Sequence, residues 1–237
     1  MNKKVRKLIS NLLVATLSIS TWELGKKQYG YLKNHKTYSA IQKQKDNTGD
    51  AQAYLKEHNF DWIQVTGTAI DYPLIVAEDN SYYLTHDYKG ESSSGGAIYY
   101  DASDVPYNGS NTVIYGHSMR DGSMFNNLNY FPKDINKFKS SKLIIETKDG
   151  KTEYTPLGFY VTNDNFIHKD IDSLPIDEAV KVIEQNADYY IRNTSYSNDS
   201  HLIALFTCNY SIKNGRLIVW YIKEWFNGKY SIINLWF

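Results

Sequence analysis

The sequence contains very little cysteine: Cys208 is the only one among 237 residues. A single cysteine excludes an intramolecular disulfide and fits none of the Cys/His spacings of structural zinc sites, so we expect no bound metal. Net charge is also absent, because Lys plus Arg and Asp plus Glu balance at 26 each. Without a basic excess nothing draws the chain to nucleic acid, and the 21 tyrosines indicate β-rich surfaces rather than a base-stacking array. We therefore expect no nucleic-acid partner.

A long hydrophobic run is missing as well. The longest apolar stretch, 8–22, has about 15 residues, fewer than the ~20 that a spanning helix usually needs. Basic residues precede it, an order that is typical of an export signal or of an uncleaved anchor with a cytoplasmic N-terminus: Lys3, Lys4, Arg6 and Lys7. We favour the uncleaved anchor. The alternatives are a signal cleaved near Ser18-Ile-Ser20 and a buried amphipathic helix of a soluble protein.

Three regions follow from the composition along the chain. Residues 1–22 form the membrane anchor or signal segment. Residues 23–59 form a helical stalk, with one helix to about Lys45, a turn-rich break at 46–50 and a short helix over Ala51–His58. Residues 60–237 form a strand-rich domain, whose core begins near Phe60.

The domain over residues 60–237 is predicted to be mainly β with helices, an α+β fold. Short runs rich in β-branched and aromatic residues recur between Gly, Asn, Asp and Ser clusters, which favours a closed antiparallel barrel over βαβ repeats. One helix, Pro175–Ile191, interrupts the strands and is expected to lie across the barrel. An Asn227-Gly228 turn predicts a last strand over Tyr230–Trp236. The remaining predicted strands are Trp62–Val65, Tyr72–Ala77, Ala97–Tyr100, Thr112–Tyr115, Leu143–Thr147, Thr152–Thr155, Phe159–Thr162, Leu202–Thr207 and Leu217–Tyr221.

The lone thiol is either an inert core residue or a nucleophile. At a pKa of ~8.5 a thiol is mostly protonated at neutral pH, so a catalytic cysteine needs a base or cation nearby. His117 is the best placed of the six histidines, because it follows a buried-looking strand and Gly116. Arg216 lies eight residues after Cys208, and the Asn214-Gly215 turn signal between them predicts two antiparallel strands with Cys208 and Arg216 side by side.

Each of these residues also has an ordinary interpretation. His117 could be a surface residue at a strand end, and Arg216 could cap a loop or pair with Glu153 or Asp199. A guanidinium beside the thiolate would instead stabilise an oxyanion formed on a carbonyl.

Taken together, the motifs resemble the sortases. "ALFTCNY" before "GRLIVW", with "NTVIYGHSM" and "MFNNL" upstream, matches the family signature of a Thr-Cys pair ending one strand, an Arg opening the next and an earlier Gly-His pair. "WIQVTGTAIDYPLIVAEDNSYYLTHDY" and "GGAIYYD", in the expected order, extend the resemblance to class B. It covers roughly Phe60 to Ile222, and the helix before the cysteine strand also suits class B.

The resemblance implies a membrane-anchored cysteine transpeptidase with an extracellular catalytic domain and a single membrane pass. Cys208 would attack the Thr carbonyl of a C-terminal sorting motif on a secreted protein, His117 would act as acid and base, and Arg216 would stabilise the oxyanion. The amine of a peptidoglycan precursor would accept the acyl group, with no cofactor. Thr207 would contribute a hydroxyl that orients the substrate or Arg216. Matching to class B suggests three further substrate-binding residues, each of which could equally be a packing residue: Asn80, Leu84 and Tyr115. The alternatives are a cysteine hydrolase without transfer, a pilin-linking sortase and a non-catalytic binding module.

Overall fold

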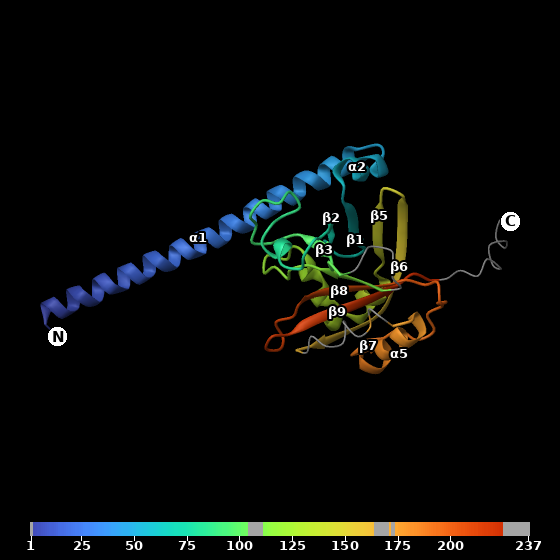
Figure 1. The fold of residues 1–237 in the computed structure, drawn as a ribbon. Coiled ribbons are helices and arrows are strands. Elements are labelled where there is room, and N and C mark those ends of the chain that lie inside the picture. The colour runs from blue at the N-terminus through green and yellow to red at the C-terminus, as the bar shows by residue number, and fades with distance from the viewer. Residues whose placement is uncertain (1, 104–110, 164–170, 172–173, 225–237) are drawn as a thin grey trace, which may run out of the picture.

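The computed structural model describes residues 2–103, 111–163, 171 and 174–224. A long helix projects from a strand-rich body, and a short helix lies on the far side of that body (Figure 1). The helical elements are α1 (Lys3–Asn47), α2 (Ala51–His58), η1 (Tyr82–Leu84), η2 (Phe125–Lys133), α3 (Ile135–Ser140) and α5 (Ile176–Asn186). The strands are β1 (Asp61–Val65), β2 (Asp71–Val76), β3 (Ile98–Tyr100), β4 (Asn111–Tyr115), β5 (Leu143–Thr147), β6 (Gly150–Thr162), β7 (Tyr189–Tyr190), β8 (Leu202–Cys208) and β9 (Arg216–Ile222).

The strands close into a barrel. Their order is β5-β1-β2-β3-β4-β8-β9-β6-β7, and β5 also pairs with β6, so that an 8-strand ring forms and β7 is added outside it. Closure pairs both edges of the sheet, which leaves the ring without an unpaired edge strand. The predicted closed barrel with accompanying helices is confirmed.

Two strand pairings differ from the expected antiparallel arrangement. β2 pairs with β3 in parallel, and β4 pairs with β8 in parallel. A parallel neighbour requires a long connection, and the chain between β4 and β8 supplies one, because it contains β5, β6 and α5. Hydrophobic periodicity does not encode strand direction, so the sequence alone could not show these two pairings.

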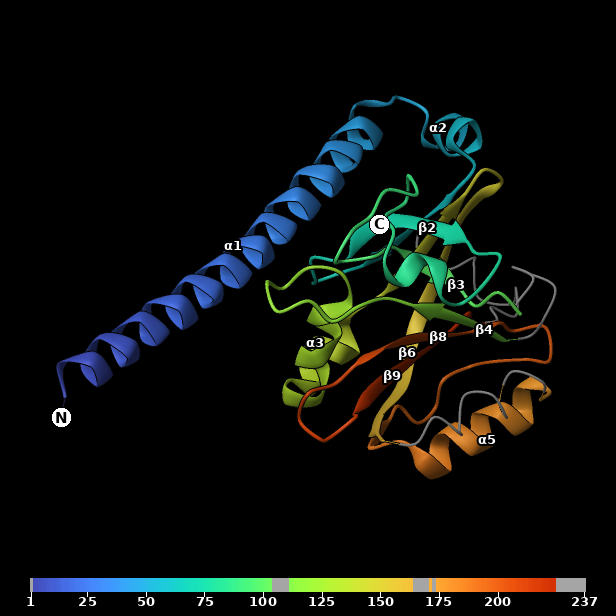
Figure 2. The same cartoon turned by 60° about the vertical axis from the view of Figure 1, so that its left-hand side comes forward.

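Alternation along the strands separates an inner from an outer apolar face. On β8, Ile203 and Leu205 belong to the cluster inside the barrel, and Leu202 and Ala204 belong to a second cluster outside it. Helix α5 packs on that outer cluster through Ile176, Ala179, Val180 and Ile183. Figure 2 shows α5 lying along the outside of the barrel, as predicted for the helix across the barrel.

The α5 helix is shorter than predicted. It ends at Asn186, and Tyr189–Tyr190 forms β7 against Gly158 and Phe159 of β6 instead of continuing the helix to Ile191. Pairing with a neighbouring strand satisfies backbone groups that a longer helix would have satisfied internally, and helical spacing alone could not show this competition. The predicted turn Asn227-Gly228 and strand Tyr230–Trp236 lie outside the described residues.

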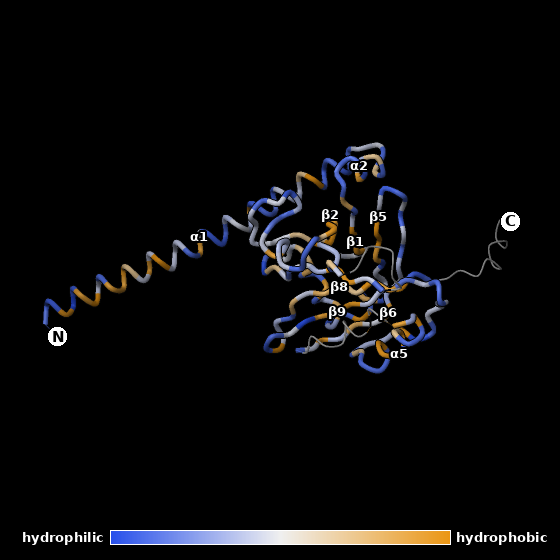
Figure 3. Tube along the Cα trace, in the orientation of Figure 1, coloured by the Kyte–Doolittle hydropathy of each residue, from blue (hydrophilic) through white to orange (hydrophobic). Residues whose placement is uncertain are grey.

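Helix α1 is continuous across the predicted boundary between residues 22 and 23. By length and composition it is the one helix of the described residues that could cross a membrane, although a signal sequence near an N-terminus would pass the same test. Apolar and polar turns alternate along its first half, which projects beyond the barrel (Figure 3). Its second half packs on the body: Tyr38 and Ile41 are buried in the same core as the barrel strands, together with Tyr54 and Leu55 of α2. The predicted short helix Ala51–His58 is confirmed.

Candidate active site

Three neighbouring strands carry the three candidate catalytic residues to the same end of the barrel. β8 lies between β4 and β9. Cys208 is the last residue of β8, Arg216 is the first residue of β9, and His117 follows the end of β4 by two residues. Because β8 and β9 are antiparallel and β4 and β8 are parallel, the end of β4, the end of β8 and the start of β9 lie at one edge.

Cys208 and Arg216 are direct cross-strand partners, as the sequence predicts. Directly opposite residues of an antiparallel pair have Cβ atoms about 4.5–5.5 Å apart and side chains on the same face. The loop between them is tightened by a hydrogen bond of 2.9 Å from the Asn209 amide to the Gly215 carbonyl. A Cβ at Gly215 would overlap with the Asn209 carbonyl oxygen, so only glycine fits there.

The Arg216 guanidinium remains close to its own loop. Its Nη1 donates to the carbonyl of Gly215 at 3.1 Å and to that of Asn214 at 3.4 Å. Neither Glu153 nor Asp199 forms an ion pair with it among the described residues. The positive charge is therefore not neutralised by either of these carboxylates and is available beside Cys208.

His117 lies level with Cys208. The β4–β8 register pairs Tyr115 with Phe206, and the Thr207 hydroxyl reaches the Gly116 carbonyl one residue further on, at 2.8 Å. Both contacts join residues 91 positions apart in the chain, and the same offset joins His117 to Cys208. Half-buried Cys208 thus has an imidazole-bearing loop on one side and a guanidinium on the other.

A backbone carbonyl orients the His117 ring. Nε2 of His117 lies 2.8 Å from the carbonyl oxygen of Leu84. A carbonyl oxygen only accepts hydrogen bonds, so Nε2 carries the proton, and Nδ1 is the basic nitrogen of the neutral ring. This arrangement gives the ring one fixed donor and one nitrogen that can take or release a proton.

The apolar surface next to Cys208 lies on the outer face of the barrel. By alternation along β8, Cys208 shares that face with Phe206, whose ring packs edge-on against Tyr115 at 5.3 Å between centroids. Phe206 and Tyr115 both border the outer cluster on which α5 packs. Two residues of strand span about 6.6 Å, so an extended peptide over Tyr115 and Phe206 would reach Cys208 within two of its own residues.

Two of the predicted substrate-binding residues are engaged within the protein. Thr207 is 2% exposed, and its hydroxyl donates to the Gly116 carbonyl. The Asn80 amide donates to Asp101 at 3.0 Å and accepts the Ala102 amide at 2.8 Å. These contacts give both residues a role in holding strand ends and loops together, and their contact with substrate stays a prediction.

Tyr115 and Leu84 differ from that pair because each leaves part of its side chain accessible. The Tyr115 hydroxyl donates to Asp101 at 2.7 Å while its ring stays half-buried on the outer face. Leu84, whose carbonyl holds His117, is 42% exposed. Burial tends to raise the pKa of Asp101, but hydrogen bonds from Ser103, Asn80 and Tyr115 outweigh it and hold that pKa below its usual value.

An amide network that the sequence analysis missed joins the two sides of the site. Nδ2 of Asn129 donates to the Cys208 carbonyl at 3.2 Å and to the Ser118 hydroxyl at 3.0 Å. Its Oδ1 accepts a bond of 2.7 Å from Asn209. Asn129 therefore contacts the residue after His117, the backbone of Cys208 and the residue after Cys208. The only signal was the asparagine-rich "FNNLN" after the histidine loop.

A second histidine lies at the opposite end of the β4–β8 pair. His201 Nε2 lies 2.9 Å from the Thr112 hydroxyl, and Nδ1 lies 3.3 Å from the Tyr154 hydroxyl. Burial, with a contribution from Lys223, lowers the pKa of His201 to about 4. This histidine is neutral at physiological pH and serves the packing of the barrel.

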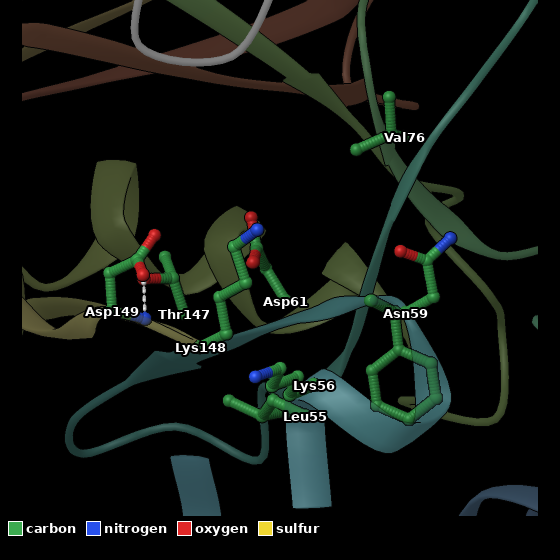
Figure 4. A pocket seen from close by; sticks show the side chains of 9 residues that line it. Leu55, Lys56, Asn59, Asp61, Val76, Thr147, Lys148 and Asp149 are labelled. Atoms are coloured by element: carbon green, nitrogen blue, oxygen red, sulfur yellow. Dashed lines mark hydrogen bonds between the residues drawn. The ribbon is translucent and has the colours of Figure 1, made fainter. Parts of the chain in front are cut away.

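A pocket of about 230 Å³ lies elsewhere, between α2 and the β5–β6 turn. Figure 4 shows Leu55, Lys56 and Asn59 on one side of it and Lys148 and Asp149 on the other. Neither Cys208 nor His117 nor Arg216 lines it. We therefore do not assign it to the chemistry of the cysteine.

Comparison with known proteins identifies the family. The sortase domain family matches residues 63–222. Sortase B of Listeria monocytogenes is 27% identical over 236 residues, which cover 90% of this chain and 94% of that protein. Sortase B of Staphylococcus aureus is 27% identical over 168 residues, 67% of each chain.

Solved structures agree. Sortase B from Bacillus anthracis is 28% identical with a TM-score of 0.70, over 83% of this chain and 98% of that one. Sortase B from Clostridium perfringens is 28% identical with a TM-score of 0.66, over 72% of this chain and 98% of that one. Since the matched domain spans β1 to β9 and carries the ends of β4, β8 and β9, the chain belongs to the sortase family, in class B, and is a cysteine transpeptidase.

Proposed function

We propose that this sortase cleaves a C-terminal sorting motif after Thr and transfers the acyl group to the amine of a cell-wall precursor. The observation that carries the proposal is the convergence at one barrel edge of Cys208, Arg216 and His117, on the ends of three adjacent strands. A sulfur nucleophile, an acid–base group and a fixed cation are the groups that acyl transfer needs.

In the first half-reaction Nδ1 of His117 takes the thiol proton of Cys208. The resulting thiolate attacks the Thr carbonyl carbon, and the carbonyl oxygen becomes an oxyanion. Arg216 stabilises that charge from the opposite strand. The bond to the leaving nitrogen then breaks, and His117 gives it the proton held on Nδ1. The product is a thioester on Cys208 and an amine.

In the second half-reaction an incoming amine attacks the thioester and loses its proton to Nδ1 of His117. The carbon–sulfur bond breaks, the new amide leaves, and the thiolate returns. The hydrogen bond from Nε2 to Leu84 keeps the ring oriented through both steps. No cofactor takes part.

The motif would lie in an extended conformation along the outer face. Tyr115 and Leu84 are the best supported of the four proposed substrate contacts, since the Tyr115 ring is half-buried beside Phe206 and Leu84, whose carbonyl holds His117, is exposed. Thr207 and Asn80 would act mainly by holding the backbone around the groove, through their bonds to Gly116 and Asp101.

We further propose that α1 anchors the enzyme in the cell membrane in a single pass, with the barrel outside. The length and apolar first half of α1 support this. Tethering would raise the effective concentration of the enzyme toward its two proposed partners, a secreted protein with a sorting motif and a peptidoglycan precursor with an acceptor amine.

Two neighbouring activities use the same residues. A class B sortase from Streptococcus pyogenes described as involved in pilus biogenesis is 28% identical with a TM-score of 0.64, so a pilin amine is an alternative acceptor. A hydrolase would release the acyl group to water instead. The identity of the acceptor separates the three possibilities.

The test incubates the full chain in detergent micelles with a library of Thr-containing pentapeptides and candidate amines, and follows products by mass spectrometry. We expect a thioester adduct on Cys208 and an amide product that contains the added amine. The Cys208→Ala variant should form neither. Hydrolysis alone at saturating amine would contradict transfer, and turnover by Cys208→Ala would contradict the assigned nucleophile.

A further inference from the structure

The second half of α1 contacts the loop that orients His117. This loop, residues 81–97, lies between β2 and β3 and contains Leu84, whose carbonyl accepts the His117 hydrogen bond. Figure 1 shows the loop lying against α1 where the helix meets the barrel. The contact is polar and buried, unlike the apolar packing of α1 on the core.

Two buried side chains of α1 form this contact, and the partly exposed Lys33 adds a hydrogen bond of 3.2 Å to the Ser92 carbonyl and an ion pair with Glu91. Asn34, which is 3% exposed, accepts a hydrogen bond of 2.7 Å from the Ser93 hydroxyl. One turn later Tyr38, 4% exposed, donates a hydrogen bond of 2.6 Å to the Gly96 carbonyl. Asn34 and Tyr38 are four residues apart and therefore lie on one face of the helix. We call these two side chains the latch.

Hydrogen bonds within the loop connect the residues that the latch contacts to the turn around Leu84, which holds His117. The Ala97 amide donates to the Tyr83 carbonyl at 2.9 Å, and the Ser93 amide donates to the Thr85 carbonyl at 2.9 Å. Both ends of the Leu84 turn are therefore bonded to residues 93–97, the part of the loop that the latch contacts.

Gly96 lies at the centre of these contacts. It has a φ of 58°, and a Cβ there would overlap with the Tyr83 carbonyl and lie 3.0 Å from the Leu84 carbonyl and 3.2 Å from Cδ2 of His117. Gly96, the Leu84 carbonyl and the His117 imidazole are therefore closely packed. If the contact with α1 were lost, Gly96 could shift toward the helix, and this shift would move the Leu84 carbonyl that holds Nε2 of His117.

We propose that Asn34 and Tyr38 are positioning residues for catalysis: the helix that leads to the membrane holds loop 81–97, and that loop holds the His117 ring with Nδ1 toward the reacting atoms. The proposal rests on the proposed function, in which His117 moves protons. Because Asn34 and Tyr38 lie before residue 60, this part of α1 would be necessary for full activity, in addition to any role in anchoring.

Tyr38→Phe in the full chain, in detergent micelles, removes only the hydroxyl that reaches Gly96. We expect kcat to fall about tenfold at nearly unchanged KM, because a small misplacement of a catalytic group is costly. Tyr29→Phe is the matched control: it is the same substitution on the same helix, at a side chain 70% exposed, and it should leave kcat unchanged.

A purely structural role of Tyr38 would not alter the tautomer of His117. Nitrogen-15 spectra of the imidazole, assigned by comparison with His117→Gln, should show a single Nε2–H form in the parent and a mixture of the two tautomers in Tyr38→Phe. Ile41→Ala is the complementary variant, because it removes apolar packing of α1 without touching the latch. It should lower the melting temperature more than Tyr38→Phe does, yet lower kcat less.

The two partners on the Asn34 side give a second, independent test. Asn34→Ala and Ser93→Ala remove the two ends of one hydrogen bond, so the double variant should lose no more kcat than the more impaired single variant. Normal kcat and an unchanged tautomer in both Tyr38→Phe and Asn34→Ala would overturn the latch. Full activity of His117→Gln would instead overturn the proposed function, so the two failures are distinguishable.

Discussion

The β4–β8 strand pair ends in a histidine at each end, and the two ends are built differently. At one end His201 is enclosed between the hydroxyls of Thr112 and Tyr154. At the other, His117 lies beyond the last strand residue, half-exposed, with one nitrogen on the Leu84 carbonyl. The same residue type is a neutral packing element where both nitrogens meet hydroxyls, and a candidate acid–base group at the end that carries Cys208.

The comparison also separates two ways of positioning a side chain. Strand register holds Cys208 and Arg216 opposite each other. His117 depends on loop 81–97 and, through that loop, on contacts from α1, while η2 holds its backbone through a hydrogen bond of 2.8 Å from the Phe125 amide to the His117 carbonyl. Substitutions at the enclosed end should therefore change stability, whereas those at the groove end should change turnover. The predictions below test that division.

The largest expected effect is the loss of Arg216. Arg216→Ala should lower kcat/KM about 10³-fold, as expected for removal of an oxyanion-stabilising donor, and Arg216→Lys should recover only part of the loss because an ammonium lacks the planar fork. The melting temperature should hardly change, since within the part of the chain that the structure describes the Arg216 side chain donates only to neighbouring loop carbonyls, those of Asn214 and Gly215. Lys213→Ala in the same loop is the control. Near-normal activity of Arg216→Lys would argue for a merely structural arginine.

At the enclosed end, His201 should make stability depend on pH. Its pKa of about 4 lies below the ordinary 6.5, so between these values the unfolded chain binds a proton that the native protein does not. The free energy of unfolding should therefore fall as the pH is lowered from about 6.5 to about 4, by up to about 3 kcal/mol.

Urea unfolding across this pH range measures the effect, and the relevant quantity is the difference between the parent and His201→Gln. That variant should have a flatter profile, whereas His58→Gln, at an exposed position, should follow the parent. If the free energy of unfolding depended on pH equally in the parent and in His201→Gln, then the pKa of His201 would not be lowered in the native protein, contrary to this prediction.

Thr207 precedes Cys208, and its hydroxyl joins the end of β8 to the residue that follows β4. Thr207→Val keeps the shape but leaves the Gly116 carbonyl without its hydroxyl donor, so it should lower the free energy of unfolding by about 1–2 kcal/mol. Thr207→Ser retains the hydroxyl and should retain most of that stability. Denaturant titration compares the two. If Thr207→Val unfolds like the parent yet loses turnover, the hydroxyl serves the substrate rather than the strands.

The smallest effect is expected at Asn129. Asn129→Ala removes the bridge between Ser118 and the Cys208 backbone, and we expect kcat to fall about tenfold because both sides of the groove lose a shared support. Asn136→Ala, at an exposed asparagine just beyond η2, is the control. An unchanged kcat in Asn129→Ala would mean that the β4–β8 strand register alone keeps the His117 loop and Cys208 aligned.

Local signals predicted part of this site and non-local pairing produced the rest. The Cys208–Arg216 pair was predictable because a turn signal separates two strong strands by a few residues. The alignment of His117 with Cys208 depends on a parallel pairing across 91 residues, which periodicity cannot indicate. The barrel follows from the recurrence of strands, but its two parallel pairings do not.

The contacts of Tyr38 and Asn129 could not be predicted for the same reason. Each is a polar side chain whose partner is a backbone carbonyl far away in the chain. No residue-type pattern encodes such a partner, because every residue offers a carbonyl. What a sequence does carry is the preference of each segment for helix, strand or turn, and this explains why α2 was predicted with its observed ends whereas β7 was not.

If α1 anchors the enzyme in a membrane as proposed, its unbroken course sets a geometric constraint on any substrate. At a rise of about 1.5 Å per residue, the helix between Trp22 and Asn34 is a rod about 18 Å long. With its apolar turns seated in a bilayer, such a rod would hold the groove at one height above the lipid surface, where a flexible tether would sample many. A secreted protein would then need a spacer of matching length between its own membrane segment and the bond to be cut, so that α1 acts as a ruler.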